Sequence, residues 1–127
     1  MAKATKLNTG LRIAAATPYS VTLPSGGWSA VVTMLAKSAD YTVTLADGGS
    51  DCQITVDASG AGRTITLYAA SGNAGHQVKV KKIDSSVNTV TIDGNASETI
   101  DGATTQVISA QYTSLSLVCD GSNWHIF

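Results

Sequence analysis

Charged residues are scarce in this chain. Asp, Glu, Lys and Arg make up 13% of its 127 residues, about half the share that is usual in soluble proteins. The net charge is −1, so the chain has neither a basic field that attracts nucleic acid nor a cationic face for anionic lipid. We expect no nucleic-acid and no membrane partner. Such a neutral surface is typical of a subunit that buries part of its exterior, which favours an oligomer.

Long apolar runs are missing as well. The basic start is followed by an apolar run over residues 11–16, which Arg12 interrupts and Pro18 ends. This run is too short for a signal peptide. No stretch approaches the roughly 18 apolar residues of a membrane-spanning helix. The sequence therefore predicts a soluble protein that is made in the cytoplasm.

Cysteine is limited to Cys52 and Cys119, which lie far apart and have no CxxC partner. A metal or redox motif therefore has no support. Both cysteines stand within apolar alternation, so we expect two buried free thiols. A disulfide or an intersubunit contact is the alternative.

No pattern of catalytic residues stands out. The eight Asp and one Glu lie mostly beside Gly or Ser, and no apolar pocket that would raise a carboxyl pKa is outlined. His76 and His125 could belong to a catalytic triad, but no serine in the sequence lies in a nucleophile elbow. The alternative is a metal on a threefold axis, bound by histidines from three subunits. We predict a protein that is not an enzyme, with no catalytic residue, metal or cofactor.

What the sequence does contain is a series of short segments in which β-branched and polar residues alternate. This alternation predicts strands. Val43, Ile54, Ile65, Val78 and Val90, which stand at the centres of successive segments, are separated by 11, 11, 13 and 12 residues. The segments cover residues 19–23, 41–45, 52–56, 63–67, 76–80, 88–92 and 114–118.

Turn signals rich in Asp and Gly separate these segments, and an amphipathic helix pattern is absent. Residues 28–37 come closest to a helix, but their β-branched residues favour a strand. We predict an all-β fold: a small β-sandwich, a barrel, or a prism-like stack of β-rungs. One thin rung cannot bury both of its faces, so stacking or trimerisation must cover them.

Residues 1–17 differ from the rest of the chain. They contain Lys3, Lys6 and Arg12 and no turn dipeptide, which indicates an extended arm that becomes ordered against a partner. Leu11 and Ile13 are its candidate apolar contacts. The predicted organisation is an arm over residues 1–17 followed by a single β domain over residues 18–127.

The last part of the chain carries an ordered set of motifs: Lys-Lys-Ile-Asp at 81–84, Val-Thr-Ile-Asp at 90–93, Glu-Thr-Ile-Asp-Gly at 98–102 and Asp-Gly-Ser-Asn-Trp-His-Ile at 120–126. In this order they resemble a C-terminal β module common in bacteriophage virion proteins. The resemblance covers residues 75–127, about 40% of the chain. It implies a trimer-forming domain of the kind found in tail fibres, tailspikes and capsid decoration proteins.

From this resemblance we expect a non-enzymatic homotrimer on the virion surface that binds the major capsid protein or another virion protein. No long fibre shaft precedes the motifs, which favours a decoration (cement) protein. The alternative is a tail-fibre or tailspike tip that binds a host receptor or carbohydrate. A carbohydrate-binding module unrelated to virions stays open too, although aromatic residues are few.

Two groups of structural residues follow from the same motifs. The apolar chain end predicts that Trp124, Ile126 and Phe127 anchor the core or a subunit interface. The Asp-Gly pairs predict positive φ angles at Gly94, Gly102 and Gly121.

Overall fold

The computed structural model describes residues 33–47 and 51–127. Within these residues the fold is all-β, as the alternation predicts, with one 3₁₀ turn at Leu45–Asp47. The part of the chain described contains no helix long and apolar enough to cross a membrane. The strands are β1 (Thr33–Lys37), β2 (Tyr41–Thr42), β3 (Asp51–Val56), β4 (Arg63–Thr66), β5 (Gln77–Lys82), β6 (Val90–Asp93), β7 (Thr105–Ile108), β8 (Ser114–Cys119) and β9 (Trp124–Ile126).

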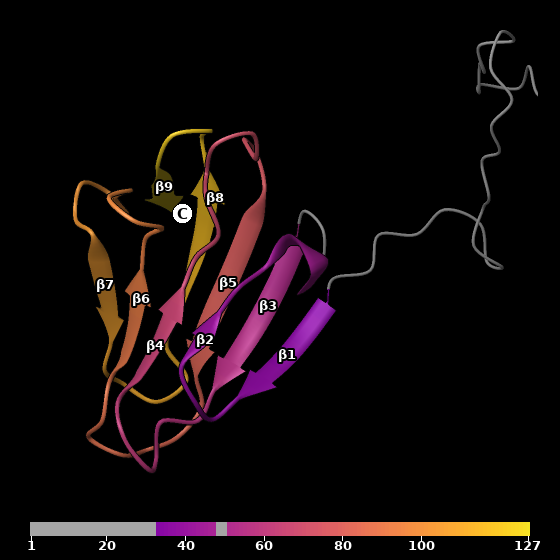
Figure 1. The fold of residues 1–127 in the computed structure, drawn as a ribbon. Coiled ribbons are helices and arrows are strands. Elements are labelled where there is room, and N and C mark those ends of the chain that lie inside the picture. The colour runs from indigo at the N-terminus through magenta and orange to yellow at the C-terminus, as the bar shows by residue number, and fades with distance from the viewer. Residues whose placement is uncertain (1–32, 48–50) are drawn as a thin grey trace, which may run out of the picture. The chain divides into compact units, whose positions relative to one another are not determined.

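The strands form two mixed sheets (Figure 1). One sheet has the order β1-β3-β5-β8-β9 and the other has the order β2-β4-β6-β7. From β1 to β6 the chain alternates between the sheets, and each strand pairs in parallel with the strand before it in the same sheet. This alternation stacks two-stranded rungs. The last strands, β7, β8 and β9, add in antiparallel orientation.

The sheets do not close into a barrel, so that predicted alternative is wrong. Their outer strands are β1 and β9 in one sheet and β2 and β7 in the other. The chain passes from sheet to sheet through turns instead of continuing one hydrogen-bonded ladder around the core. The predicted arm over residues 1–17 and the predicted strand over residues 19–23 lie outside the described residues.

Buried side chains line up in columns because the strand register places like positions side by side. In the five-stranded sheet, Leu35 pairs with Ile54, Ile54 with Val80 and Val80 with Leu115. Alternate residues of each strand face inward. Inward residues of both sheets belong to one hydrophobic cluster within the described residues. Stacking thus covers the faces that one rung alone would expose.

Strand positions agree with the sequence pattern, but some strand ends do not. The segment at 41–45 keeps only two residues of strand, because the Asp47 carboxylate accepts hydrogen bonds from the Thr44 amide (2.6 Å) and hydroxyl (2.9 Å) and draws the chain into the 3₁₀ turn. Strands β7 and β9 were not predicted. Each strand is short and lacks a clear alternating pattern. Its extended conformation depends on pairing, with β6 for β7 and with β8 for β9.

The three turn glycines serve two different purposes. Gly102 and Gly121 have φ angles of 88° and 99°, as the Asp-Gly pattern predicts. Gly94 does not have a positive φ, so the prediction for this residue is wrong. A Cβ atom at Gly94 would lie 2.3 Å from the carbonyl oxygen of Glu98. Close backbone approach is therefore the reason for glycine at this position.

Both cysteines are buried free thiols, as predicted. Cys52 lies on β3 and Cys119 at the end of β8. Burial, the largest cause, raises the pKa of the Cys52 thiol. A raised pKa and burial both reduce the reactivity of a thiol.

Candidate functional site

Three of the four motifs that carry the resemblance supply polar connections of the fold, and the fourth, at 90–93, is strand β6. The first connection is a buried ion pair at the end of β5. Lys82 occupies an inward position of β5, as Val78 and Val80 do on the same strand. It pairs with Val56 of β3 and is 0% exposed. Its Nζ donates to the carboxylate of Asp84 (2.5 Å) and to the carbonyl oxygens of Asp84 (2.9 Å) and Ser86 (3.2 Å).

Asp84 links this lysine to the neighbouring turn. Its carboxylate accepts hydrogen bonds from the amide of Ala58 (2.7 Å) and from the amide (3.0 Å) and hydroxyl of Ser86. Burial raises the pKa of this carboxyl, but the hydrogen bonds from Lys82 and Ser86 outweigh burial and hold the pKa well below its usual range. A fully paired buried charge of this kind fixes the geometry of the turn.

A second connection joins residues 98–102 to distant turns. The amide of Ala70 donates to both oxygens of the Glu98 carboxylate, at 2.9 Å and 3.0 Å. The side-chain oxygen of Asn123 accepts from the amide (2.8 Å) and hydroxyl (3.0 Å) of Thr99. These bonds join segments 24 to 28 residues apart in the chain. The motif residues thus hold turns in place.

The C-terminal turn contains a histidine between two carboxylates. His125 Nε2 lies 2.7 Å from an oxygen of Asp120, and Nδ1 lies 3.5 Å from an oxygen of Asp101. Hydrogen bonding to Asp120 is the largest cause that raises the pKa of His125. The same hydrogen bond, with the amides of Asn123 and Ser122, lowers the pKa of Asp120 to about 2. The cluster is about half exposed.

The predicted anchor residues lie in different environments. Trp124 is fully buried and packs edge-on against Tyr68, with ring centroids 5.2 Å apart. Ile126 is partly buried against the same core. Phe127 is 84% exposed. The arm residues Leu11 and Ile13 lie outside the described residues.

The two histidines do not form a shared site. His76 lies beside Tyr68, with ring centroids 6.2 Å apart, whereas His125 is held by the aspartates. Over residues 33–47 and 51–127, no three His, Cys, Asp or Glu side chains come together in a way that could hold a metal.

A cluster near the first strands was not predicted. The Tyr41 hydroxyl donates to Asp47 (2.7 Å), and the Lys37 ammonium lies 3.5 Å from the centroid of the Tyr41 ring. The hydrogen bond to Asp47 is the largest cause that raises the pKa of Tyr41 to about 12. A cation over an aromatic ring stabilises by roughly 0.5–1 kcal/mol at an exposed site. These contacts join β1, β2 and the 3₁₀ turn.

A groove crosses the outward side of the five-stranded sheet and was also missed by sequence reasoning. It has a volume of about 350 Å³, within the range of roughly 300–1,000 Å³ typical of small-molecule sites. We call it the lysine groove. It is lined by Met34 of β1, Gln53, Ile54 and Thr55 of β3, Lys79 and Lys81 of β5, and Ser114 of β8.

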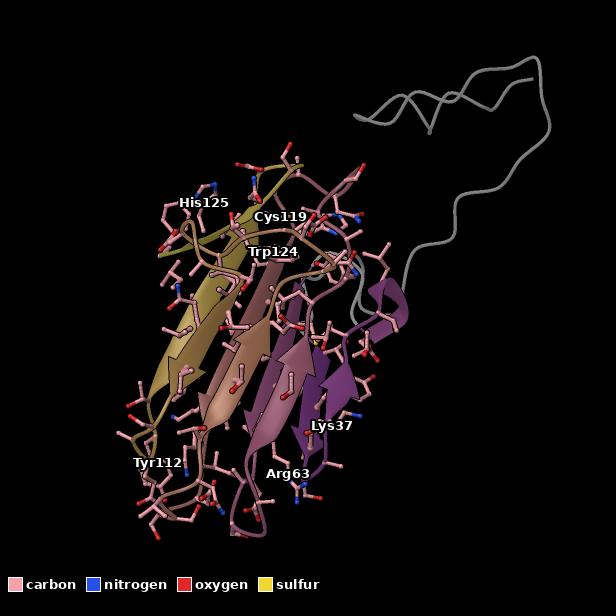
Figure 2. All side chains as sticks on the ribbon, turned by 60° about the vertical axis from the view of Figure 1, so that its left-hand side comes forward. Lys37, Arg63, Tyr112, Cys119, Trp124 and His125 are labelled. Atoms are coloured by element: carbon pink, nitrogen blue, oxygen red, sulfur yellow. The ribbon has the colours of Figure 1, made fainter. Side chains whose placement is uncertain are left out.

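Tyr112 adjoins one end of the lysine groove. Its ring centroid lies 5.6 Å from the Lys81 ammonium, its side chain is 65% exposed, and its φ is 63°. A bulky residue in this left-handed conformation costs about 1–3 kcal/mol. Tyr112 lies at the end of the sheets opposite to His125 (Figure 2). Alternation alone does not reveal such a residue, because the conformation depends on the turn.

Comparisons with protein-family models and with curated proteins found no match for this chain.

Proposed function

We propose that this chain is a non-enzymatic structural protein of the exterior of a bacteriophage particle, where it acts as a homotrimeric capsid decoration protein. The observation that carries the proposal is the role of the motif residues. Lys82, Asp84, Glu98, Asn123 and Asp120 each join or cap turns. Motif residues that stabilise turns are suited to a protein that serves as a stable structural subunit.

The outward side of the four-stranded sheet supports a trimer. It combines threonines with Val107, which is 55% exposed, and Asp93 is its one charged residue in the described strands. Neutral β-branched surface is suited to packing against a second copy of the same chain. The threonines of this side are Thr42, Thr64, Thr66, Thr91 and Thr105.

Charge distribution supports a role for the arm. Lys3, Lys6 and Arg12 stand in a segment without acidic residues, whereas the chain after residue 32 contains five basic and all nine acidic residues. An arm of positive charge is suited to an acidic capsid lattice. Leu11 and Ile13 would add the apolar contacts that offset the loss of conformational entropy on binding.

The test uses capsids that lack the protein, from the phage whose genome encodes this chain. Full-length protein and a variant without residues 1–17 are mixed with these capsids at equal concentration and sedimented together. We expect the full-length trimer to sediment with the capsids and the shortened trimer to stay in solution. Equal binding of both would place attachment on the β domain. Binding of neither would overturn the decoration role and favour the tail-fibre tip.

A further inference from the structure

We propose that the lysine groove binds an acidic oligosaccharide. This inference goes beyond the structural role proposed above, and it depends neither on the trimer nor on capsid attachment. The chain after residue 32 has nine acidic and five basic residues, yet two of the five basic residues, Lys79 and Lys81, lie together on one sheet face.

These two lysines are available to a ligand. Both are exposed, because they occupy the outward positions of β5. The ion pairs of the described residues involve Lys82 and His125 only. Lys82 is buried, Lys37 lies over Tyr41 and Arg63 is partly buried on the other sheet. Lys79 and Lys81 therefore have no ion-pair partner among the described residues, although the Lys81 ammonium also lies 5.6 Å from the Tyr112 ring centroid. Their positive charge attracts a carboxylate, sulfate or phosphate group.

Neutral hydrogen-bonding groups surround the lysines. The side chains of Gln53 and Ser114 form no hydrogen bond within the described part of the chain. The Thr55 hydroxyl donates to the carbonyl oxygen of Leu35 (3.3 Å) and can still accept a hydrogen bond. Donors and acceptors next to cations match a ligand in which hydroxyl and acidic groups alternate.

Tyr112 adds an apolar platform at the Lys81 end of the groove. An exposed aromatic ring offers a flat face against which the C–H face of a sugar ring can pack. Its left-handed backbone conformation places strain next to the groove, and strain of this kind gathers at ligand sites. A hydrogen bond from its amide to the carbonyl oxygen of Lys82 (2.8 Å) holds it there.

The extent of the groove is suited to a short chain of sugars. It crosses β1, β3, β5 and β8, which are neighbours in the sheet. At an interstrand spacing of about 4.8 Å, this path spans about 14 Å. An acidic peptide would meet the same charges, but it lacks the C–H faces and hydroxyls that the neutral lining and Tyr112 recognise. The groove is therefore better suited to a saccharide than to a peptide.

The experiment measures binding of the purified full-length protein to an array of acidic and neutral oligosaccharides. We expect retention of uronate-, sialate- or sulfate-bearing members, no retention of neutral members, and weaker binding as salt rises. The variant Lys79→Gln/Lys81→Gln should lose roughly tenfold or more in affinity. The variant Lys79→Arg/Lys81→Arg keeps the charge and serves as the matched control.

Tyr112→Gly separates binding from folding. Glycine adopts a positive φ without penalty, so this variant should keep or raise its melting temperature while it loses affinity for the acidic saccharides. The proposal is overturned if no acidic member binds, or if the glutamine variant binds as tightly as the arginine control. Displacement of the saccharide by an equal concentration of oligoglutamate would also overturn it, in favour of an acidic protein partner. None of these outcomes bears on capsid attachment or subunit number.

Discussion

Lys82 shows how a single buried charge can define a turn. Its ammonium is enclosed by Asp84 and Ser86, and its strand position is one that apolar residues fill elsewhere in the same sheet. A buried pair contributes little compared with a well-packed apolar pair, but removal of one partner leaves the other charge without compensation. The stability of the turn therefore depends on the presence of both partners.

We predict that Lys82→Met lowers the free energy of unfolding by about 3–5 kcal/mol, because the Asp84 carboxylate loses its cation. Lys79→Met is the matched control, since Lys79 is an exposed residue on the same strand and its loss should change stability by less than about 0.5 kcal/mol. Urea unfolding at equal protein concentration measures both variants. Equal effects of the two substitutions would show that the ion pair does not hold the turn.

His125 connects two turns through its aspartates, and this connection depends on pH. The folded-state pKa of His125 is raised, so its contribution to stability is fully present below the unfolded value of 6.5 and is lost as pH rises through the folded value. Asp120, with a pKa lowered to about 2, contributes above its unfolded value of 3.8 and loses this contribution as pH falls toward 2. The connection is strongest between these limits.

We predict that NMR titration of the histidine ring finds the pKa of His125 above 6.5. Asp120→Asn should lower this pKa toward the ordinary value, because the largest cause of the shift is removed. Asp93→Asn, on the outward side of the other sheet, is the control and should leave it unchanged. An unaltered pKa in Asp120→Asn would contradict the pairing.

Burial changes sharply along β9 and the residue that follows it. Trp124 points into the core, whereas Phe127 directly after the strand is exposed. Trp124→Ala should lower the free energy of unfolding by about 3–5 kcal/mol, since a large buried side chain is removed. Phe127→Ala should leave the circular dichroism spectrum and subunit fold unchanged. Thermal unfolding of both variants checks this contrast, and similar losses in both would contradict it.

The sequence predicted elements better than their connections. Alternation at residues 52–56, 63–67 and 114–118 is a local property, and β3, β4 and β8 lie at these positions. Which strands pair is not local: β5 pairs in parallel with β3 and in antiparallel orientation with β8. No single segment contains that information. The alternating pattern alone therefore could not decide between a sandwich, a barrel and stacked rungs.

The candidate sites show the same limit. Lys82 could have been suspected from the sequence, because it follows Val78 and Val80 at the inward spacing and Asp84 comes two residues later. Lys79 and Lys81 alternate with these valines on the outward side. The lysine groove itself could not have been predicted, since Met34, Gln53 and Ser114 come from three other strands that only the register brings together. The strain at Tyr112 arises from its turn.

We propose that this β domain is a subunit of a trimer. The stacked sheets leave β1, β2, β7 and β9 as outer strands within the described residues, and Phe127 and Val107 expose apolar surface. An edge strand and an exposed apolar residue are both suited to burial against another copy. The net charge of −1 offers little repulsion between copies.

The most direct test of this claim is the mass of the purified full-length protein in solution, measured by light scattering at micromolar concentration. We predict three times the mass of one chain, and a reduced trimer fraction for Phe127→Ala with the subunit fold retained. A mass equal to that of one chain over the whole micromolar range would contradict the trimer, and with it the proposed role as a trimeric decoration protein.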